Sequence, residues 1–252
     1  MIMNLDRVIA VRNSKTIYRD GDKSIKVFNS EYSKADVLNE ALNQARIEEL
    51  DLNIPKILEV TTVEGKWAIV YEHIKGKTLD RLMAENPEKK EEYIALLVDL
   101  QMSVHEKRCP LLNSLKDKLK REIAECDLEA TTRYDLHIRL EEQPNHNKVC
   151  HGDFIPSNII VTDDGVPYII DWSHATKGNS TADIARTYLL LKLNGDSDGA
   201  KKYLELFCRK GGIEKETIQK WLPVIAAAQS VKAREEDRIT LISWVDKLDL
   251  DD

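Results

Sequence analysis

The feature that most constrains the fold of this chain is the stretch between His151 and Asp171. It opens with His-Gly-Asp-Phe-Ile-Pro-Ser-Asn, and the segment Ile-Ile-Asp-Trp follows further along the chain. Four residues separate Asp153 from Asn158, which is the spacing between the catalytic base and the metal-binding Asn of a phosphoryl-transfer loop. Asp171 adds a third oxygen-bearing side chain. One magnesium–nucleotide complex needs this kind of spacing, so the stretch predicts a phosphoryl-transfer site.

The length and composition fit a globular protein that folds on its own. The 252 residues suffice for one large domain or for two lobes that share a cleft, and a hydrophobic content of 42% supports a proper core. The chain holds 37 basic and 44 acidic residues, which gives a net charge of -7. This balance argues against a binder of nucleic acid or of an anionic membrane, and it favours a neutral or cationic partner.

The sequence also indicates a cytoplasmic location. No stretch approaches the roughly 20 apolar residues of a membrane span, and the first residues lack the apolar core of a signal peptide. The four cysteines form no CxxC pair, so we expect reduced thiols rather than a zinc site or disulfides. We expect no membrane partner and a monomer or weak homodimer.

The first third of the chain alternates like a small antiparallel sheet. Short strand-like runs are separated by turn residues, and Asp20-Gly21 is a good hairpin signal. One amphipathic helix is predicted from Lys34 to Leu50, where apolar residues recur at helical spacing. The segment from His73 to Lys77 breaks the pattern and could be a hinge. The predicted strands are Arg7 to Val11, Thr16 to Asp20, Ser24 to Phe28, Lys56 to Thr62 and Lys66 to Glu72.

Beyond Thr78 the sequence becomes mainly helical. A small hairpin is expected around the turn Asp163-Asp164-Gly165, with strands at Asn158 to Val161 and Pro167 to Asp171. The predicted helices are Thr78 to Glu85, Pro87 to Glu106, Leu111 to Glu129, Trp221 to Ala233 and Arg238 to Leu248, with further helix from about Thr181. The chain therefore predicts an α+β fold with two lobes. Residues 1–73 form an N-terminal nucleotide-binding lobe, with the sheet and one helix, and residues 74–252 form a C-terminal catalytic and substrate-binding lobe.

Each oxygen-bearing residue of the opening stretch can be given a role. Asp153 is the candidate base that orients or deprotonates an attacking hydroxyl, on a loop where Gly152 permits close approach of the backbone. Pro156 stiffens the loop before Asn158. Asn158 and Asp171 are the candidate magnesium ligands, because magnesium prefers hard oxygen donors and usually keeps some waters.

A lone cation is predicted in the third strand. Lys26 is flanked by apolar residues, as expected for a lysine that contacts nucleotide phosphates. Glu40 follows in the predicted helix and is its expected partner, since an ion pair there would hold the ammonium in place.

These residues give the chain a resemblance to a known family. It resembles small-molecule kinases of the aminoglycoside phosphotransferase type, which include choline kinase-like enzymes and share the two-lobed protein-kinase-like fold. The segments that carry the resemblance are His151 to Asn158 and Ile170 to Trp172, which match the family's His-Gly-Asp-x-x-x-x-Asn and Ile-Asp-Trp. The resemblance covers the chain from Arg7 to about Leu248 and is strongest from His151 to Asp183.

The resemblance implies ATP and magnesium as cofactors and a small-molecule hydroxyl as the phosphate acceptor. It implies that the backbone from Glu72 to Ile74 binds adenine, and it gives the roles above to Asp153, Asn158 and Asp171. It also implies a supporting, structural role for Asp183, because residues 178–186 resemble the family's Gly-x-Pro-x-x-Asp segment, with serine at the usual proline position.

One departure from the kinase pattern concerns the phosphate loop. No Gly-x-Gly-x-x-Gly lies between the first two strands, and the equivalent loop is Arg12-Asn13-Ser14-Lys15-Thr16. Backbone amides or the hydroxyls of Ser14 and Thr16 could still contact phosphate.

The sequence leaves the acceptor open among an aminoglycoside-like antibiotic, an amino alcohol, a sugar and another metabolite. Converging aromatic residues could cage a quaternary ammonium group, and an acidic rim could suit a polycation. Core packing and a solvated face are the alternative roles of these residues. The aromatic candidates are Trp172, Tyr188, Trp221 and Trp244, and the acidic ones are Glu235, Glu236, Asp237, Asp249, Asp251 and Asp252.

Two other function classes remain as alternatives. A protein Ser/Thr kinase would need an activation segment, but the segment between Trp172 and Asp183 is short and no Ala-Pro-Glu follows it. A nucleotide-binding pseudokinase would be favoured by the loss of a key residue. The key residues are all present: Lys26, Asp153, Asn158 and Asp171.

Overall fold

The computed structural model describes residue 5, residues 7–12 and residues 14–245. The described residues group into two compact units. Within the described ranges, the first comprises the residues up to Glu85 together with Pro156–His174, and the second comprises Asn86–Ile155 together with the residues from Ala175 onward. The predicted boundary between the two lobes at residues 73 and 74 stays a prediction.

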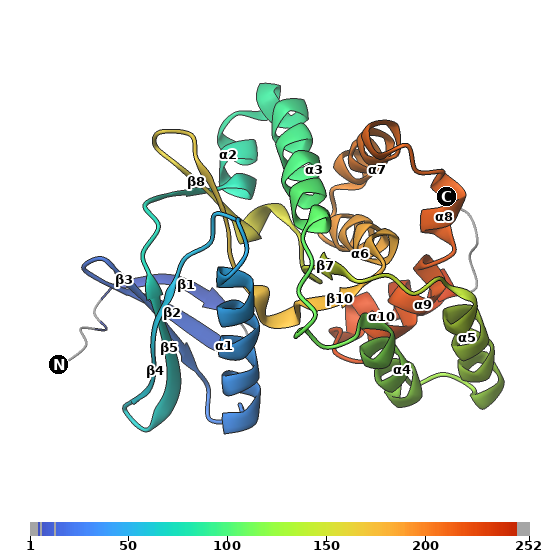
Figure 1. Ribbon diagram of the computed structural model, residues 1–252, viewed down its shortest axis with the longest axis horizontal. Coiled ribbons are helices and arrows are strands. Elements are labelled where there is room, and N and C mark those ends of the chain that lie inside the picture. Colours follow the sequence, from blue (N-terminus) through green and yellow to red (C-terminus); the bar gives the residue numbers. More distant parts are fainter. Residues whose placement is uncertain (1–4, 6, 13, 246–252) are drawn as a thin grey trace. The chain divides into compact units, whose positions relative to one another are not determined.

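The first unit is built on an antiparallel sheet of five strands in the order β1-β2-β3-β5-β4 (Figure 1). The strands β2 and β3 form the hairpin that Asp20-Gly21 predicts, and Gly21 has a φ of 59°, in the left-handed region that glycine tolerates. The strands are β1 (Val8–Arg12), β2 (Lys15–Asp20), β3 (Lys23–Phe28), β4 (Ile57–Val63) and β5 (Lys66–Glu72). The prediction of this sheet is confirmed.

The alternation of side chains along β3 builds two small cores, one on each face of the sheet. Ile25 and Val27 pack with Ala68 and Val70 on one face. Phe28 packs on the other face with Ile69 and with Val37 and Ala41 of helix α1 (Lys34–Glu48). Ser33 begins the helix, because its side chain accepts a hydrogen bond from the Asp36 N–H at 3.1 Å. The face of β3 that bears Lys26 is therefore the face that α1 covers.

A second, three-stranded sheet in the order β6-β8-β9 completes the first unit. It contains β6 (Gly76–Thr78), β8 (Ile159–Thr162) and β9 (Pro167–Ile169), and α2 (Leu79–Glu85) follows β6. Gly165 closes the predicted hairpin with a φ of 83°. The break predicted from His73 to Lys77 is shorter than expected, because β6 pairs with β8 from Gly76 onward. Gly76 is required there, since a Cβ atom would lie 2.3 Å from the Val161 carbonyl oxygen.

The second unit is mainly helical, with one small two-stranded sheet. Helix α6 is almost entirely buried and packs against α7 and α9. The helices are α3 (Lys90–Glu106), α4 (Leu115–Glu125), α5 (Ala130–Glu142), α6 (Ser180–Leu193), α7 (Ser197–Gly211), α8 (Lys215–Gln219), α9 (Leu222–Ser230) and α10 (Glu235–Val245). The strands are β7 (Lys148–Cys150) and β10 (Thr176–Gly178), which pair antiparallel.

Three predictions about this unit were wrong in detail. The helix predicted from Leu111 to Glu129 is α4 alone, because Ser114 caps its start by accepting from the Asp117 N–H at 3.2 Å. Helix α5 and strand β10 were not predicted. The helix predicted at Trp221 to Ala233 is the shorter α9. The last helix begins earlier than predicted, and residues 246–248 of that prediction lie outside the described residues.

The α+β class is confirmed, with a small antiparallel sheet, one helix beside it and a mostly helical remainder. None of the helices in the described ranges is both long enough and apolar enough to cross a membrane.

Candidate functional site

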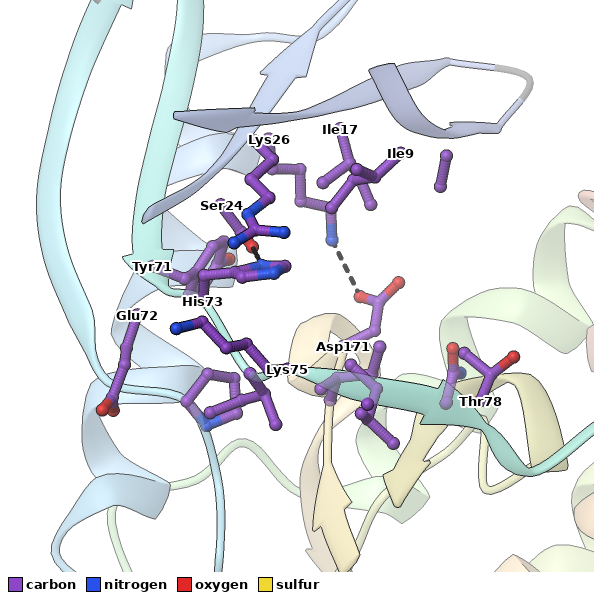
Figure 2. A pocket seen from close by; sticks show the side chains of 18 of the residues that line it. Ile9, Ile17, Ser24, Lys26, Tyr71, Glu72, His73, Lys75, Thr78 and Asp171 are labelled. Atoms are coloured by element: carbon purple, nitrogen blue, oxygen red, sulfur yellow. Dashed lines mark hydrogen bonds and ion pairs between the residues drawn. The ribbon is translucent and has the colours of Figure 1, made fainter. Parts of the chain in front are cut away.

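The first unit contains a cavity of about 540 Å³. It lies between strands of the five-stranded sheet, the segment that follows β5, and the segment from Ser157 to Asp171 (Figure 2). Five of the predicted site residues line it: Lys26, Glu72, Ile74, Asn158 and Asp171. The cavity therefore brings together residues from both ends of the sequence of this unit.

Lys26 reaches the cavity from β3 and makes two ion pairs. Its Nζ atom lies 2.5 Å from Oε1 of Glu40 on α1, so the pair predicted from the sequence is present. The same Nζ atom lies 3.0 Å from Oδ1 of Asp171 (Figure 2). The side chains of Lys26 and Glu40 are each only 6% exposed, and this burial makes the contacts stronger than those of a surface pair.

The electrostatics of this cluster favour charged side chains. Burial alone would lower the pKa of Lys26, but Asp171 and Glu40 raise it well above its ordinary value. Burial alone would raise the pKa of Asp171, but Lys26 and then Lys15 hold it well below its ordinary value. Lys26 and Asp171 thus face each other as a charged pair.

Glu40 holds a second cation that the sequence analysis did not assign. The Nζ atom of Lys15 lies 3.0 Å from Glu40 Oε2, and it also lies 5.5 Å from the ring centroids of Phe28 and Tyr32. Lys15 is the residue that follows the glycine-free turn between β1 and β2. Its position beside Ser14 and Thr16 is the only signal that the sequence offered.

Asp171 adopts an unusual backbone conformation. Strand β9 ends at Ile169, so the strand predicted to reach Asp171 was too long. Asp171 has a φ of 61°, in the left-handed region that few residues other than glycine adopt. The preceding Ile170 N–H donates to the Asn158 carbonyl at 2.9 Å, which ties the residue before Asp171 to Asn158. Such strain is often held at functional sites.

The residues at this end of the cavity fit a magnesium ion. Asn158 is 7% exposed, and both its side chain and that of Asp171 line the cavity with hard oxygen donors. Two protein oxygens suit magnesium, which takes its remaining ligands from phosphate and water. Among the described residues, no group of three or more His, Cys, Asp and Glu side chains could hold a metal by itself.

The segment after β5 has the backbone groups that the hinge prediction needs. The Glu72 N–H donates to the Lys56 carbonyl and the His73 N–H to the Asp22 carbonyl, both at 2.9 Å. The Ile74 N–H has no hydrogen-bond acceptor within the described part of the chain. Ile74 lines the cavity, as does His73, which is fixed by a hydrogen bond between Nδ1 and the Ser24 hydroxyl at 2.9 Å (Figure 2).

Ser14 is not among the residues that line the cavity. Its carbonyl accepts a hydrogen bond from the Asn29 N–H at 2.9 Å, which extends the pairing of β2 with β3 by one residue. The neighbouring Asn13 of the predicted phosphate loop lies outside the described residues. A contact between Ser14 and phosphate stays a prediction.

Asp153 belongs to the second unit and lies on the loop after β7. Its N–H donates to Nδ1 of His151 at 3.1 Å, and its carboxylate is paired with Arg186 of α6, whose Nη2 atom lies 2.9 Å from Oδ1. The Arg186 Nε atom also donates to the Gly152 carbonyl. Arg186 was not singled out from the sequence, although it stands three residues after Asp183 and so on the same face of a helix.

Asp183 is the centre of a buried hydrogen-bond network. Its Oδ1 atom accepts from the Gly152 N–H at 2.8 Å, and its Oδ2 atom contacts His105 Nε2 at 2.9 Å and Gln101 Nε2 at 3.0 Å. Burial alone would raise the pKa of Asp183, but hydrogen bonds from His105, Gln101 and the Gly152 backbone lower it to about 2. Asp183 therefore stays ionised and fixes the backbone of the loop, as expected for a supporting residue.

The aromatic candidates for a cation cage do not form an open site. Trp172, Tyr188 and Trp221 are each 1% exposed and belong to cores. Trp244 is half-buried and packs on Tyr188, with ring centroids 6.1 Å apart. The ammonium of Lys192 already lies over this pair, 5.9 Å from the Tyr188 centroid and 5.6 Å from that of Trp244.

The acidic candidates are partly neutralised by neighbouring arginines. The Nη2 atom of Arg234 lies 3.0 Å from Oδ2 of Asp237, and the Nη1 atom of Arg238 lies 3.1 Å from Oε2 of Glu235. Glu236 is exposed on the same helix. The remaining members of the predicted acidic rim, Asp249, Asp251 and Asp252, lie outside the described residues.

Comparisons with known proteins agree with this architecture. The model of the phosphotransferase enzyme family (APH) matches residues 8–221. Among solved structures, an apo thermostable mutant of aminoglycoside phosphotransferase APH(4)-Ia is similar, with a TM-score of 0.71, 16% identity, and coverage of 96% of this chain and 92% of the other. An aminoglycoside-3'-phosphotransferase of type VIII has a TM-score of 0.66 at 18% identity, with coverage of 89% and 92%.

A choline kinase, LicA from Streptococcus pneumoniae, is also similar. Its TM-score is 0.67 at 14% identity, with coverage of 97% of this chain and 92% of the other. No curated protein matches the sequence. At these identities the similarity establishes the fold, which is the predicted protein-kinase-like one.

Proposed function

The chain belongs to the phosphotransferase enzyme family, and we propose that it transfers the γ-phosphate of ATP to a hydroxyl group of a small molecule. The observation that carries the proposal is the cavity of the first unit, where Lys26 is paired with both Glu40 and Asp171 and where Asn158 supplies a further oxygen. Phosphoryl transfer depends on positioning and on neutralising charge, and these side chains can do both.

The proposed reaction gives a separate task to each of the following site residues. Lys26 would neutralise phosphate oxygens once it exchanges part of its contact with Asp171 for the nucleotide. The backbone from Glu72 to Ile74 would bind the adenine edge. Asn158 and Asp171 would hold magnesium, which when bound supplies positive charge to the phosphates. Asp153 would orient the acceptor hydroxyl. The acceptor oxygen bonds to the γ-phosphorus as the bond to ADP breaks, and the hydroxyl proton passes to Asp153 and then to solvent.

The nucleotides bound in similar structures support the proposal that this chain uses a nucleotide. APH(4)-Ia has been solved in a ternary complex with ADP and hygromycin B, and LicA has been solved in complex with AMP. We infer ATP as the phosphate donor of this chain on that basis and from the cavity. The class of acceptor stays open. The cytoplasmic location and the oligomeric state, a monomer or weak homodimer, stay predictions.

The proposal is tested by ADP release from Mg-ATP across a panel of acceptors. The panel holds aminoglycosides, macrolides, choline, ethanolamine, amino sugars, ribose derivatives and homoserine, and Asp153→Asn serves as the blank. We expect one class to stimulate ADP release in the wild type and not in the variant. Mg-ATP binding without stimulation by any acceptor would favour the pseudokinase alternative or a protein substrate. The absence of Mg-ATP binding would contradict the proposal.

A further inference from the structure

One turn of helix α6 presents two opposite charges to the backbone of a single residue, Gly152, in the Asp153 loop. Asp183 accepts from the Gly152 N–H at 2.8 Å, and Arg186 donates from Nε to the carbonyl of the same residue. Gly152 has a φ of 87°, a conformation that residues with a Cβ atom rarely adopt. The loop is thus held on both sides of Gly152 by residues one helical turn apart.

Arg186 continues from this peptide to the carboxylate of Asp153. Its Nη2 atom donates to Oδ1 of Asp153 at 2.9 Å, and the single N–H of Nε, which donates to the Gly152 carbonyl, also lies 3.3 Å from that oxygen. The side chain of Arg186 is 11% exposed and that of Asp153 is 29% exposed. Because one rigid guanidinium group binds both the Gly152 carbonyl and the Asp153 carboxylate, it restricts where that carboxylate lies relative to the loop.

We propose that Arg186 is a positioning residue for phosphoryl transfer, which fixes the rotamer of Asp153 and keeps its carboxylate ionised. The proposal rests on the proposed function, because it takes Asp153 as the residue that orients the acceptor hydroxyl. A cation beside a carboxylate favours its charged form and makes it a weaker base. Orientation of the hydroxyl then matters more than early removal of its proton, which suits a loose transition state.

Other charged groups also face this pair. Lys118 of α4 interacts electrostatically with both Arg186 and Asp153, and also with Glu122 on its own helix and with Lys232 after α9. His151 lies beside the Asp153 backbone. Substitution of Arg186 leaves all of these groups in place, so a change in the titration of Asp153 can be assigned to Arg186.

The first measurement does not depend on activity. Aspartate labelled with ¹³C at Cγ is incorporated into the wild type, Arg186→Met and Arg186→Lys, and the Asp153 signal is identified by its loss in Asp153→Asn. We expect the titration midpoint of Asp153 to rise by about 1 to 3 pH units in Arg186→Met. It should stay near the wild-type value in Arg186→Lys, which keeps the charge. An unchanged midpoint in Arg186→Met overturns the proposal.

The second measurement is the rate of ADP release, with the best acceptor of the panel or with water as the acceptor. We expect Arg186→Met to lower kcat by about 100-fold or more while KM for Mg-ATP changes less than about twofold, since the interaction acts on the transition state. The acidic limb of its pH profile should move to higher pH. Arg186→Lys should lower kcat by about tenfold with the acidic limb unchanged, because an ammonium keeps the charge but lacks the planar fork that reaches both the Gly152 carbonyl and Asp153.

A matched control separates positioning from general stability. Arg133 on α5 is another half-buried arginine of the second unit, and it donates only to the carbonyls of Cys126 and Leu128. Arg133→Met should leave the pH profile of kcat unchanged. If this variant loses as much kcat as Arg186→Met and shows the same shift of the acidic limb, the proposal is overturned. If Arg186→Met does not fold, wild-type kcat in Arg186→Lys overturns it. If Asp153→Asn keeps wild-type turnover, the proposed function fails, and the titration of Asp153 still decides whether Arg186 sets its charge.

Discussion

Lys26 donates to Asp171 at 3.0 Å although 145 positions separate them in the sequence. The contact joins the sheet to the segment that follows β9, and Lys26 is at the same time paired with Glu40. One buried ammonium therefore contacts two carboxylates, and Lys15 adds a second cation to Glu40.

Replacement of this ammonium should affect both stability and turnover. Lys26→Met leaves Glu40 and Asp171 without their shared cation, so we expect the free energy of unfolding to fall by about 3 kcal/mol. Turnover should fall strongly, because the phosphates lose a positive partner. Urea denaturation and the rate of ADP release measure the two effects. Lys23→Met on the same strand is the control and should change neither, and wild-type turnover in Lys26→Met would return Lys26 to a purely structural role.

The metal assignment predicts a selective loss of nucleotide affinity. Asp171→Asn keeps the shape of the side chain but removes the charge that magnesium prefers. We expect the Kd for Mg-ATP to rise by about tenfold or more, while the Kd for ATP measured in excess chelator changes little. Calorimetric titrations at several magnesium concentrations provide the comparison. Equal losses with and without magnesium would argue against a metal ligand at Asp171.

The low pKa of Asp183 predicts a pH dependence of stability. Its pKa is about 2 in the folded protein, against an ordinary value of 3.8. Because the folded pKa is the lower one, the stabilisation is fully present above about pH 4 and is lost as the pH falls toward 2. The contribution is about 2 kcal/mol. The difference in unfolding free energy between the wild type and Asp183→Asn should therefore shrink below pH 4, and a constant difference from pH 6 to pH 2 would contradict the assignment.

The lowered pKa of Lys118 predicts that this residue destabilises the folded protein at neutral pH, whereas Asp183 stabilises it. Burial and the nearby Arg186 lower its pKa to about 8, so the folded protein disfavours the charged form. Below pH 8 Lys118 is charged in the folded protein, and the free energy cost of burying that charge is fully present. Between pH 8 and the ordinary pKa of 10.5 the folded protein loses the Lys118 proton, so its free energy of unfolding rises. Lys118→Met should raise the free energy of unfolding at pH 7 by about 1 to 3 kcal/mol, with no gain above pH 10.5. Lys120→Met on the same helix should show no such gain in denaturation at either pH.

The sequence was sufficient for features that rest on local patterns. The five strands and α1 follow from short-range alternation and turn residues, and the Lys26–Glu40 pair follows because β3 directs Lys26 to the face that α1 covers. Helix α5 was missed because its residues include Thr131 and Thr132, which favour helix weakly, and because it lacks a side-chain cap.

Features that depend on distant segments could not be predicted. The left-handed backbone of Asp171 and the pairing of Lys15 with Glu40 arise only when strands and helix meet. The role of Arg186 depends on the packing of α6 against the Asp153 loop. The spacing between Asp183 and Arg186 placed both on one helical face, but nothing in the sequence showed which loop that face contacts.

The most direct test of the account is mass-spectrometric analysis of the acceptor after incubation with Mg-ATP and the wild-type protein or Asp153→Asn. We expect the wild type to add one phosphoryl group to a hydroxyl of one acceptor class, and the variant to bind Mg-ATP normally but to form no product. Equal product formation by Asp153→Asn would contradict the central claim that Asp153 orients the hydroxyl that receives the phosphate.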